Sequence, residues 1–350
     1  MTLHILIRRL MIDFRSDTVT KPSEEMLAAM FTAKVGDDVF GEDETVNALE
    51  EKMAHLFGME SAMFCPSGTM TNQIAIKCFT QPLDEVITDQ TAHVYRYEGG
   101  GMMFNSGVSV RLLNGDRGRV SAEMIESEIN PIGNVHHPHS SLVVLENTVN
   151  RGGGSFYTLE DIAPIYHLCK LKGLKLHLDG ARIFNALAAS GDHPKDFGAY
   201  FDGISVCLSK GLGAPVGSVL LGNKATIHYA RRVRKVLGGG MRQAGFLAAA
   251  GIYALDHHIE RLKDDHQHAQ LIAEALSALP FVKKILPVDT NIIIFELHPH
   301  KDADQFVAQL QHKGILCGTF GKQMIRFVTH LDITESKVAQ TISILKGLTS

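Results

Sequence analysis

The sequence predicts an α/β fold in which a large domain built on a mainly parallel sheet precedes a small α+β domain. Two observations lead to this prediction. Short apolar runs alternate with stretches of helical spacing through about the first two thirds of the chain, which is typical of a parallel sheet covered by helices on both faces. From about residue 255 onward the order of elements changes. We therefore expect an N-terminal segment (1–22), a large domain (23–254) and a small C-terminal domain (255–350).

The elements of the large domain follow from the spacing of apolar residues. Residues 23–31 and 45–57 carry apolar side chains at helical intervals, and Thr45 is expected to cap the second of these helices. Further helices are expected at 159–171 and 183–190. Short apolar runs predict buried strands at 62–65, 85–88, 108–113, 142–145, 174–178, 204–208 and 219–221.

The C-terminal third begins with a helical region from Arg242 to Leu262. Beyond it, helix-like and strand-like stretches follow one another without a run of parallel-sheet strands. Helices are expected at 268–279, 303–313 and 335–348, and strands at 291–297 and 324–330.

Composition excludes several classes of function. The 350 residues carry a net charge of −4 from mixed signs, so nothing points to nucleic acid or to a membrane surface as a partner. The basic stretch RRVRK at 231–235 is interpreted as one solvated or interface face of a helix. No apolar stretch approaches the roughly 20 residues that a helix needs to cross a bilayer.

The cysteines and the N-terminus indicate a cytoplasmic protein. The five cysteines are odd in number and never form a CxxC pair, which favours free thiols in a reducing compartment. The first ten residues lack the charge order and the cleavage site of a secretory signal. Because Met11 opens the stretch MIDFRSDT, we expect residues 1–10 to be a start-site extension.

The stretch GISVCLSKGLGAPVGSVLLG (203–222) places one lysine in a glycine-rich turn between two apolar strands. The small neighbours of Lys210 argue against a role in solubility. Partial desolvation favours the neutral amine, which is a nucleophile toward a carbonyl group. Taken alone, an ordinary surface lysine is the simpler interpretation.

Two further stretches place polar groups at strand ends. HLDGAR (177–182) puts Asp179 at the carboxyl end of an apolar strand, where open parallel sheets bind ligands. In CPSGTMTN (65–72) a strand ends and Ser67-Gly68-Thr69 leads into a helix, whose free N–H groups can cradle an anion. This stretch is neither a Walker loop nor a GxGxxG fingerprint. The alternatives are a capping aspartate and a simple capped turn.

Scattered cationic side chains complete the set of candidates. Three histidines (His136, His137 and His139) crowd a proline-flanked loop, but they lack an HExxH spacing and a cysteine partner. We therefore predict no metal site. The other candidates for binding or proton transfer are Arg15, Arg182, Arg326 and His93.

Considered jointly, these features make a consistent cofactor site. An anion cradle, an acid and a lysine at the strand ends of one parallel sheet are the parts needed to hold pyridoxal phosphate. The acid keeps the pyridine nitrogen protonated, and the lysine holds the aldehyde until an amino acid displaces it. The order of cradle, Asp179 and Lys210 resembles that of the fold-type I pyridoxal-phosphate enzymes.

Eight segments in a fixed order resemble the low-specificity L-threonine aldolases of the β-eliminating lyase superfamily. The similarity extends from about Ile12 to the C-terminus, and such an ordered series is highly specific. The segments are DFRSDTVTKPSEEML, VGDDVFGEDETVNALE, PSGTMTNQIA, LENTVNRGGG, HLDGARIFNA, CLSKGLGAPVGS, GGGMRQAGFLAAAGIYAL and IRFVTHLD.

The resemblance implies the fold-type I transferase fold and a set of cofactor contacts. Lys210 would bond to the cofactor aldehyde, Asp179 would pair with the pyridine nitrogen, and His93 would stack on the ring. The phosphate would be held by Gly68, Thr69 and Ser209, and by Arg242 from a neighbouring subunit. All of these residues are named by their match to the family's motifs.

The resemblance also implies substrate contacts. Arg182, Arg326 and Ser16 would bind the α-carboxylate, because fork-shaped, charge-assisted contacts suit a planar anion. His136 would lie near the substrate β-hydroxyl, although the idiosyncratic loop allows the register to slip to His137. Tyr97 would shape the side-chain pocket, or would be an ordinary packing residue. Val149 stands where the family often has histidine, a departure that touches none of these roles.

The implied reaction is retro-aldol cleavage of a β-hydroxy-α-amino acid. His136 or His93 would take the β-hydroxyl proton, directly or through water, and the products would be glycine and an aldehyde. Alternatives are another fold-type I activity (aminotransfer, racemisation or β-elimination) and a non-catalytic oligomeric binding protein. A nicotinamide-dependent oxidoreductase fits the sheet pattern but lacks its fingerprint.

Several properties stay open from the sequence. It does not distinguish threonine from allo-threonine or from bulkier β-hydroxy amino acids, since one pocket contact of about 1–3 kcal/mol decides such a preference. It names no ligand set for a cation near the cofactor. The family implies a homotetramer of paired dimers with active sites shared between subunits.

Overall fold

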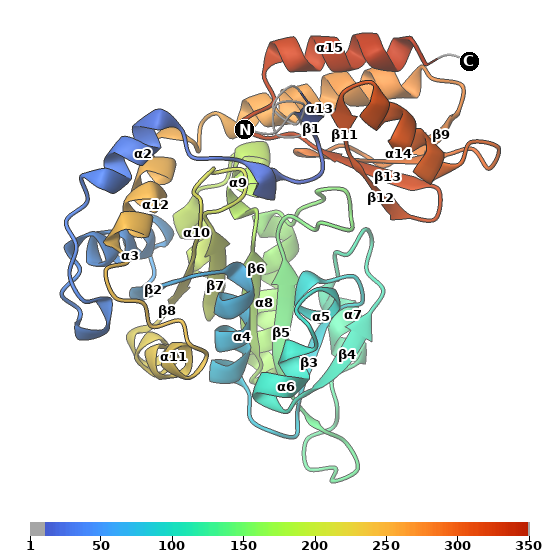
Figure 1. Ribbon diagram of the computed structural model, residues 1–350. Helices are drawn as coiled ribbons and strands as arrows, with labels where there is room; N and C mark the ends of the chain where they lie inside the picture. The colour runs from blue at the N-terminus through green and yellow to red at the C-terminus, as the bar shows by residue number, and fades with distance from the viewer. Residues whose placement is uncertain (1–10, 349–350) are drawn as a thin grey trace.

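The computed structural model describes residues 11–348, so the start-site extension predicted for residues 1–10 lies outside the described residues. A large sheet with helices on both sides forms the lower part of Figure 1, and a smaller C-terminal region, coloured orange to red, lies above its upper edge. The predicted α/β architecture with a small α+β region is confirmed.

The large sheet has seven strands in the order β2-β8-β7-β6-β5-β3-β4, and every one was predicted. All strands run in the same direction except β8, which is antiparallel to both of its neighbours, so the sheet is mainly parallel. The strands are β2 (Ser61–Cys65), β3 (Asp84–Asp89), β4 (Ser109–Leu113), β5 (His139–Glu146), β6 (Lys175–Gly180), β7 (Gly203–Cys207) and β8 (Ser218–Gly222).

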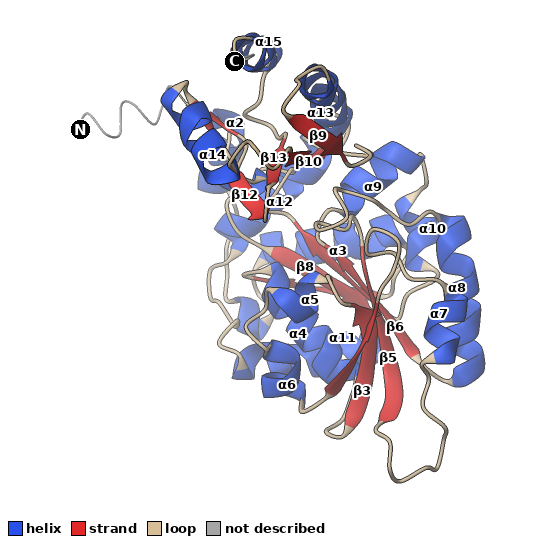
Figure 2. Cartoon of the chain, turned by 90° about the vertical axis from the view of Figure 1, so that its right-hand side faces the viewer, coloured by secondary structure: helices blue, strands red, loops and turns tan. Residues whose placement is uncertain are grey.

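Helices cover both faces of this sheet (Figure 2). Side chains alternate between the two faces along β2, so that Phe64 belongs to the core under α3 and α8, whereas Met63 packs under α4 and α11. One layer contains α4 (Gly68–Phe79), α5 (His93–Arg96), α6 (Gly101–Ser106) and α11 (Lys224–Val236). The other side contains α2 (Glu24–Phe31), α3 (Glu44–Phe57), α7 (Ala122–Ser127), α8 (Leu159–Lys172), α9 (Ile183–Ser190), α10 (Pro194–Gly198) and α12 (Gly245–His257).

The predicted cap of α3 is wrong by two residues. Asp43 precedes the helix and accepts a hydrogen bond on Oδ1 from the Val46 N–H at 3.0 Å. Thr45 lies inside the first turn, and its hydroxyl donates to the Lys34 carbonyl at 2.6 Å. The stretch DET offers two residues with capping side chains, and the more N-terminal one occupies the position whose oxygen can reach a free N–H.

The C-terminal region has its own four-stranded antiparallel sheet in the order β12-β13-β10-β9. Its core is aromatic: Phe295 packs edge-on against both Phe306 and Phe327. The strands are β9 (Val282–Ile285), β10 (Ile292–Leu297), β12 (Gly318–Gly321) and β13 (Met324–Val328), and the helices are α13 (Leu262–Ser277), α14 (Ala303–His312) and α15 (Glu335–Lys346).

The N-terminal segment packs onto this C-terminal region. Strand β1 (Ile12–Asp13) pairs in parallel with β11 (Ile315–Leu316), and the ring of Phe14 stacks on that of Phe327 at 5.0 Å. A short 3₁₀ helix, η1 (Asp17–Val19), then leads toward the large sheet, while a second one, η2 (Asp38–Phe40), precedes α3. The boundary expected after residue 254 lies within α12, and the division at that point stays a prediction.

Candidate active site

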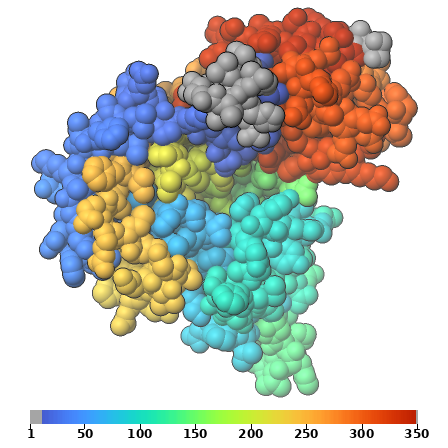
Figure 3. All heavy atoms as spheres, in the orientation of Figure 1, coloured from blue at the N-terminus to red at the C-terminus, as the bar shows by residue number. Residues whose placement is uncertain are grey.

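The carboxyl ends of the parallel strands meet at the sheet edge that faces the C-terminal region. Strands β5 and β6 end side by side, with Glu146 in register with Asp179. Strand β7 ends at Cys207, three residues before Lys210, and β2 ends at Cys65, directly before the cradle stretch. In the space-filling view, green and yellow atoms from the middle of the chain lie in a recess between the red C-terminal region and the blue-to-cyan segments (Figure 3).

The cradle stretch forms the N-terminus of α4, as predicted. Ser67 caps this helix, because its Oγ accepts a hydrogen bond from the Met70 N–H at 3.2 Å. Beside it, the buried Ser218 Oγ has no hydrogen-bond partner among residues 11–348, and a Cβ added to Gly68 would lie 3.4 Å from it. Free N–H groups, the helix dipole and an unused hydroxyl suit a phosphate group at this place.

Asp179 has one carboxylate oxygen free for a ligand. The side chain is 2% exposed, and Oδ1 accepts from the Ala181 N–H at 3.1 Å. The buried Oδ2 has no hydrogen-bond partner within the described part of the chain. A buried acceptor without a partner is costly, and a protonated pyridine nitrogen is the donor that it needs. The residues at this edge therefore fit the pyridoxal phosphate expected from the sequence.

His93 lies next to Asp179 and is supported by Glu98. The Nδ1 atom of His93 is 3.1 Å from Glu98 Oε1, and one polar atom from each of His93, Glu98 and Asp179 falls within a 4.8 Å cluster. Burial lowers the pKa of His93, but the bond to Glu98 and the negative charge of Asp179 outweigh it and raise the pKa above its ordinary value. These surroundings therefore increase the proton affinity of the imidazole.

Glu98 is itself fully enclosed and bonded. Asn72 Nδ2 donates to Oε1 at 3.0 Å and Gln73 Nε2 donates to Oε2 at 2.6 Å. Although an imidazole and two carboxylates could hold a metal ion, Glu98 is already occupied by these two amides and by His93. The amides come from α4, so the helix that supplies the cradle also orients the histidine.

At the end of β5, burial and hydrogen bonds act in opposite directions on the pKa of Glu146. Burial first, and then the charge of Asp179, raise the pKa of Glu146 to about 7, against hydrogen bonds from the backbone N–H groups of Asn150 and His93 that lower it. These bonds measure 2.9 and 2.8 Å. The carboxyl group thus fixes the start of α5, where His93 stands, to the end of β5.

Lys210 lies in the turn between β7 and β8, half-buried, as the glycine-rich sequence predicts. Its carbonyl accepts from the Thr20 hydroxyl at 3.1 Å and from the Gly213 N–H at 2.9 Å. The positive charge of Lys210 contributes to the lowered pKa of Asp17 and opposes the raised pKa of His93, so the amine lies near both residues.

The two arginines expected at the substrate carboxylate have different surroundings. Arg182 donates to the buried Asp17 through Nε at 2.6 Å and through Nη2 at 2.7 Å. Burial alone would raise the pKa of Asp17, but the Arg182 charge lowers it to about 2. The charge of Arg182 is therefore largely balanced by Asp17, and its Nη1 makes no hydrogen bond to a residue between 11 and 348.

Arg326, on β13, has neutral partners instead. Its Nη1 donates to Asn150 Oδ1 at 2.7 Å and its Nη2 to the Arg15 carbonyl at 2.9 Å, next to Ser16. It forms no ion pair with any residue between 11 and 348. Burial and the charge of Arg182 lower the pKa of Arg326 to about 10, so it keeps its charge at neutral pH. Arg326 therefore offers an unbalanced cation to an anionic ligand.

The structure corrects the position of His136. This residue lies in an exposed loop before β5, at the amino end of the strand, while the site lies beyond its carboxyl end. The loop projects from the bottom of Figure 1, on the far side of the sheet. Eight residues of extended strand span about 26 Å, so within one chain His136 and His137 do not reach the substrate position.

Ser16, Tyr97 and Ser209 are brought to the site. Ser16 caps η1 beside Arg182, the Tyr97 ring is 5.5 Å from that of His93, and Ser209 adjoins Lys210. In its own chain Arg242 is 54% exposed on its side chain and pairs with Asp37 at 2.9 Å, and its role at the site of a neighbouring subunit stays a prediction.

Sequence reasoning missed several residues that shape the site. Apart from Ser218, the missed residues are acids and amides, and most of their partners are distant in sequence, so no local spacing indicates their role. Glu146 carried one usable signal, since it directly follows an apolar strand in LVVLE, as Asp179 does in LHLD. The missed residues are Asp17, Glu98, Glu146, Asn150 and Ser218.

Comparison with known proteins gives consistent matches. Residues 13–299 match the family model described as beta-eliminating lyase. The chain is 42% identical over 338 residues to a probable low-specificity L-threonine aldolase 2 of Arabidopsis thaliana, with 95% of both chains covered. It is 40% identical to the low specificity L-threonine aldolase of Escherichia coli K12, which covers 94% of this chain and 97% of the relative.

A solved structure of similar fold is that of the Leishmania major threonine aldolase. The TM-score is 0.85 at 23% sequence identity, and the match covers 97% of this chain and 99% of that one. At this level of identity the likeness concerns the fold. The arrangement of a large, mostly parallel sheet and a small C-terminal sheet is therefore shared over almost the full length.

Proposed function

The chain belongs to the β-eliminating lyase family and, within it, to the low-specificity L-threonine aldolases, and we propose that the carboxyl edge of its large sheet is the site of this activity. The enzyme cleaves L-threonine and L-allo-threonine to glycine and acetaldehyde. The observation that carries the assignment of the site is the free, buried oxygen of Asp179 beside the Lys210 turn, since together they match what pyridoxal 5'-phosphate needs.

When bound, pyridoxal phosphate supplies an acceptor for the electrons released as the Cα–Cβ bond breaks. Lys210 would hold its aldehyde carbon, Asp179 its pyridine nitrogen, and Gly68, Thr69 and Ser209 its phosphate. Arg326, with Ser16 and the free Nη1 of Arg182, would bind the substrate carboxylate. The carboxylate contacts fix the rotation of the substrate, and so decide which of the bonds at Cα is aligned for cleavage.

His93 is proposed as the base for the β-hydroxyl proton. It is the imidazole that one chain places at this edge near Asp179 and Lys210, since His136 lies at the other edge. Although burial lowers the pKa of His93, the hydrogen bond to Glu98 and the charge of Asp179 raise it, which makes the neutral imidazole a stronger base. A positioned general base contributes roughly 10²- to 10⁴-fold to the rate.

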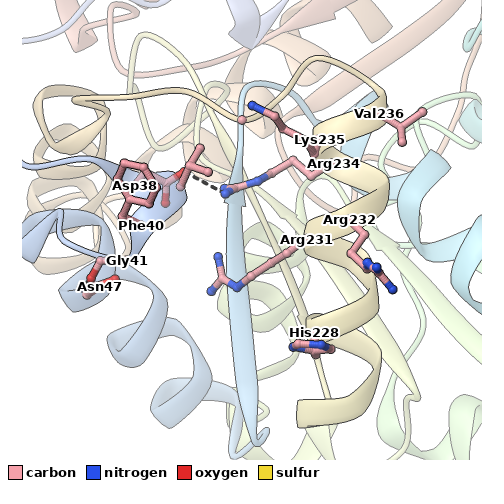
Figure 4. Close-up of a pocket in the computed structure, with 12 residues that line it drawn as sticks. Asp38, Phe40, Gly41, Asn47, His228, Arg231, Arg232, Arg234, Lys235 and Val236 are labelled. Atoms are coloured by element: carbon pink, nitrogen blue, oxygen red, sulfur yellow. Dashed lines mark hydrogen bonds and ion pairs between the residues drawn. The ribbon is translucent and has the colours of Figure 1, made fainter.

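We infer that a second copy of the chain covers the face around α11. A cavity of about 1000 Å³ lies there, lined by Arg231, Arg234 and Lys235 of α11 and by the η2 segment (Figure 4). Apolar side chains stand out around it, with Phe40 74% and Val236 86% exposed. Such exposed apolar area supports a homo-oligomer, and the family implies a tetramer with shared sites.

We also propose the cytoplasm as the location. The five cysteines are free thiols, four of them buried, which suits a reducing compartment. Within residues 11–348, no helix combines the length and the apolar character needed to cross a membrane.

Product analysis tests the proposed function. The purified holoenzyme is incubated with each of the four threonine stereoisomers and with phenylserine, and amino-acid and carbonyl products are quantified. We expect glycine and aldehyde in equal amounts from the L-isomers. A 2-oxo acid formed in place of glycine would show that the site transfers the amino group instead, and no product at all would favour a binding protein.

A further inference from the structure

The hairpin of β12 and β13 brings an aromatic ring between two arginines. Phe320 lies near the end of β12, and Arg326 lies on β13, the neighbouring strand. The Cζ atom of Arg326 is 4.6 Å from the centre of the Phe320 ring, and the Cζ atom of Arg151 is 4.4 Å from it. Both guanidinium groups therefore lie at cation–π distance from one ring.

Arg151 ties this hairpin to the large sheet. It lies in the loop after β5, and its Nη1 donates to the Phe320 carbonyl at 2.6 Å. The adjacent residue, Asn150, accepts the hydrogen bond from Arg326 at 2.7 Å. Two consecutive residues of the large-sheet loop thus hold two residues of the small-sheet hairpin: Asn150 binds the Arg326 guanidinium directly, and Arg151 holds Phe320, whose ring contacts that guanidinium.

The Phe320 ring holds two like-charged arginines near each other without an acidic partner from residues 11–348. Arg326 and Arg151 carry like charges, and the charge of Arg151 contributes to the lowered pKa of Arg326. Neither forms an ion pair within the part of the chain that the structure describes. The electron-rich ring of Phe320 attracts both cations without neutralising either. An acidic partner would hold Arg326 equally well, but it would compete with the substrate for the charge.

The same contacts continue to the cofactor side of the site. Arg151 also lies 5.8 Å from the centre of the Tyr97 ring, and Tyr97 is 5.5 Å from His93. A row of neighbouring side chains therefore runs from the histidine expected on the cofactor ring to the arginine expected on the substrate carboxylate. It joins residues from α5, the β5 loop and the C-terminal hairpin.

We propose that Phe320 and Arg151 are positioning residues that hold the Arg326 guanidinium in place for the substrate carboxylate. This inference rests on the proposed function, because it takes Arg326 as the carboxylate-binding group. Its consequence is specific: loss of the Phe320 ring weakens ligands that carry an α-carboxylate, and leaves ligands without one unaffected.

The test compares two amines that bind the holoenzyme and differ in the carboxylate. Dissociation constants for glycine and for ethanolamine are measured from the change in visible absorbance of the bound cofactor, and KM and kcat are measured with L-threonine. The variants are Phe320→Leu, which keeps apolar volume, Phe320→Tyr, which keeps the ring, and Arg151→Met, which keeps length but removes the charge. Lys170→Met, which removes a cation 5.3 Å from the Tyr166 ring on α8, is the matched control.

Phe320→Leu is expected to raise the glycine dissociation constant and the KM for threonine about 5- to 30-fold, with kcat within about threefold of the parent. Ethanolamine and cofactor affinities stay within about twofold. Phe320→Tyr restores the parent values, Arg151→Met gives a smaller rise for glycine alone, and Lys170→Met changes nothing.

Equal weakening of glycine and ethanolamine would overturn the positioning role, because it would indicate a general loss of the site. Unchanged glycine binding in both Phe320→Leu and Arg151→Met would overturn it as well. Failure of the proposed function is distinguishable, since it would appear in the parent enzyme as an absence of glycine formed from threonine, whatever the variants do.

Discussion

Histidines lie at both the carboxyl edge and the amino edge of the seven-stranded sheet, where the parallel strands end and begin. The surroundings of these histidines differ in burial. At the carboxyl edge His93 lies among three acids, Glu98, Glu146 and Asp179, and each of these acids is nearly inaccessible to solvent. At the amino edge, the exposed loop before β5 carries His136 and His137 in contact with water. At the carboxyl edge the pKa values of His93 and Glu146 are raised, and Asp179 Oδ2 is buried without a partner among the described residues.

The difference shows that strand direction, not histidine content, determines where chemistry can occur. Buried polar groups without partners are costly, and a fold keeps them where a ligand completes their bonds. In the loop before β5, water can satisfy the exposed side chains of His136 and His137. Four substitutions test this contrast.

Lys210→Ala is expected to have the largest effect. Without the amine, nothing in the turn can bond to the cofactor aldehyde, so threonine cleavage should fall by at least about 1000-fold. Aldehyde release measures the rate, and the visible spectrum reports whether the cofactor is covalently held. Lys263→Ala, which removes an exposed lysine, is the control. Normal turnover in Lys210→Ala would remove the lysine from the mechanism.

Asp179→Asn should have the next largest effect. The amide cannot offer a charged acceptor to the pyridine nitrogen, and a charge-assisted hydrogen bond is worth about 1.5–3 kcal/mol, so cofactor affinity should fall roughly 10- to 100-fold. Equilibrium dialysis against pyridoxal phosphate measures it. Asp192→Asn is a matched control, because Asp192 Oδ2 is also buried without a partner in the described chain but lies between α9 and α10. Equal losses of cofactor affinity in both variants would contradict a specific bond between Asp179 and the pyridine nitrogen.

Glu146→Gln should change the pH dependence of stability. The pKa of Glu146 is about 7 in the fold, through burial and the charge of Asp179, against 4.5 for an unperturbed glutamate. The folded state therefore binds more protons between these values, and the free energy of unfolding of the cofactor-free protein decreases as the pH rises from about 4.5 to about 7. Replacement by glutamine should remove up to roughly 3 kcal/mol of this decrease.

Urea denaturation of the cofactor-free protein at pH 5 and pH 8 measures the effect. The parent should lose more stability between the two pH values than Glu146→Gln does. The comparison between pH values matters here, because glutamine also loses one of the two backbone hydrogen bonds at every pH. Parallel pH profiles for the two proteins would contradict the raised pKa.

His136→Asn should have the smallest effect. An exposed side chain at the amino edge contributes little to the fold or to the site of its own chain, so kcat/KM should change by less than about threefold. Steady-state kinetics with L-threonine is sufficient, with His137→Asn measured in parallel. A large loss confined to His136→Asn would show that the loop reaches the site of another copy of the chain. The amino edge of one chain would then contribute to the carboxyl-edge site of its partner.

The sequence by itself determined the alternation of strands and helices, the seven strands of the large sheet, and the residues at strand ends. Lys210, Asp179 and the Ser67–Thr69 cradle could be recognised because each directly follows an apolar run, and parallel strands bring such positions to one edge. These are local patterns, which can be identified from residues that are neighbours in the sequence. The family resemblance then supplied roles for His93, Arg326 and Ser16.

The tertiary structure alone decided which groups are partners. Asp17 and Arg182 are 165 positions apart in the sequence, and Arg326 and Asn150 are 176 apart. No local spacing in the sequence therefore predicts either hydrogen bond. The same holds for Phe320 between Arg151 and Arg326. The structure also separated His93 from His136, two histidines with the same expected role, because the direction of β5 carries one end of the strand to the buried edge and the other end to water.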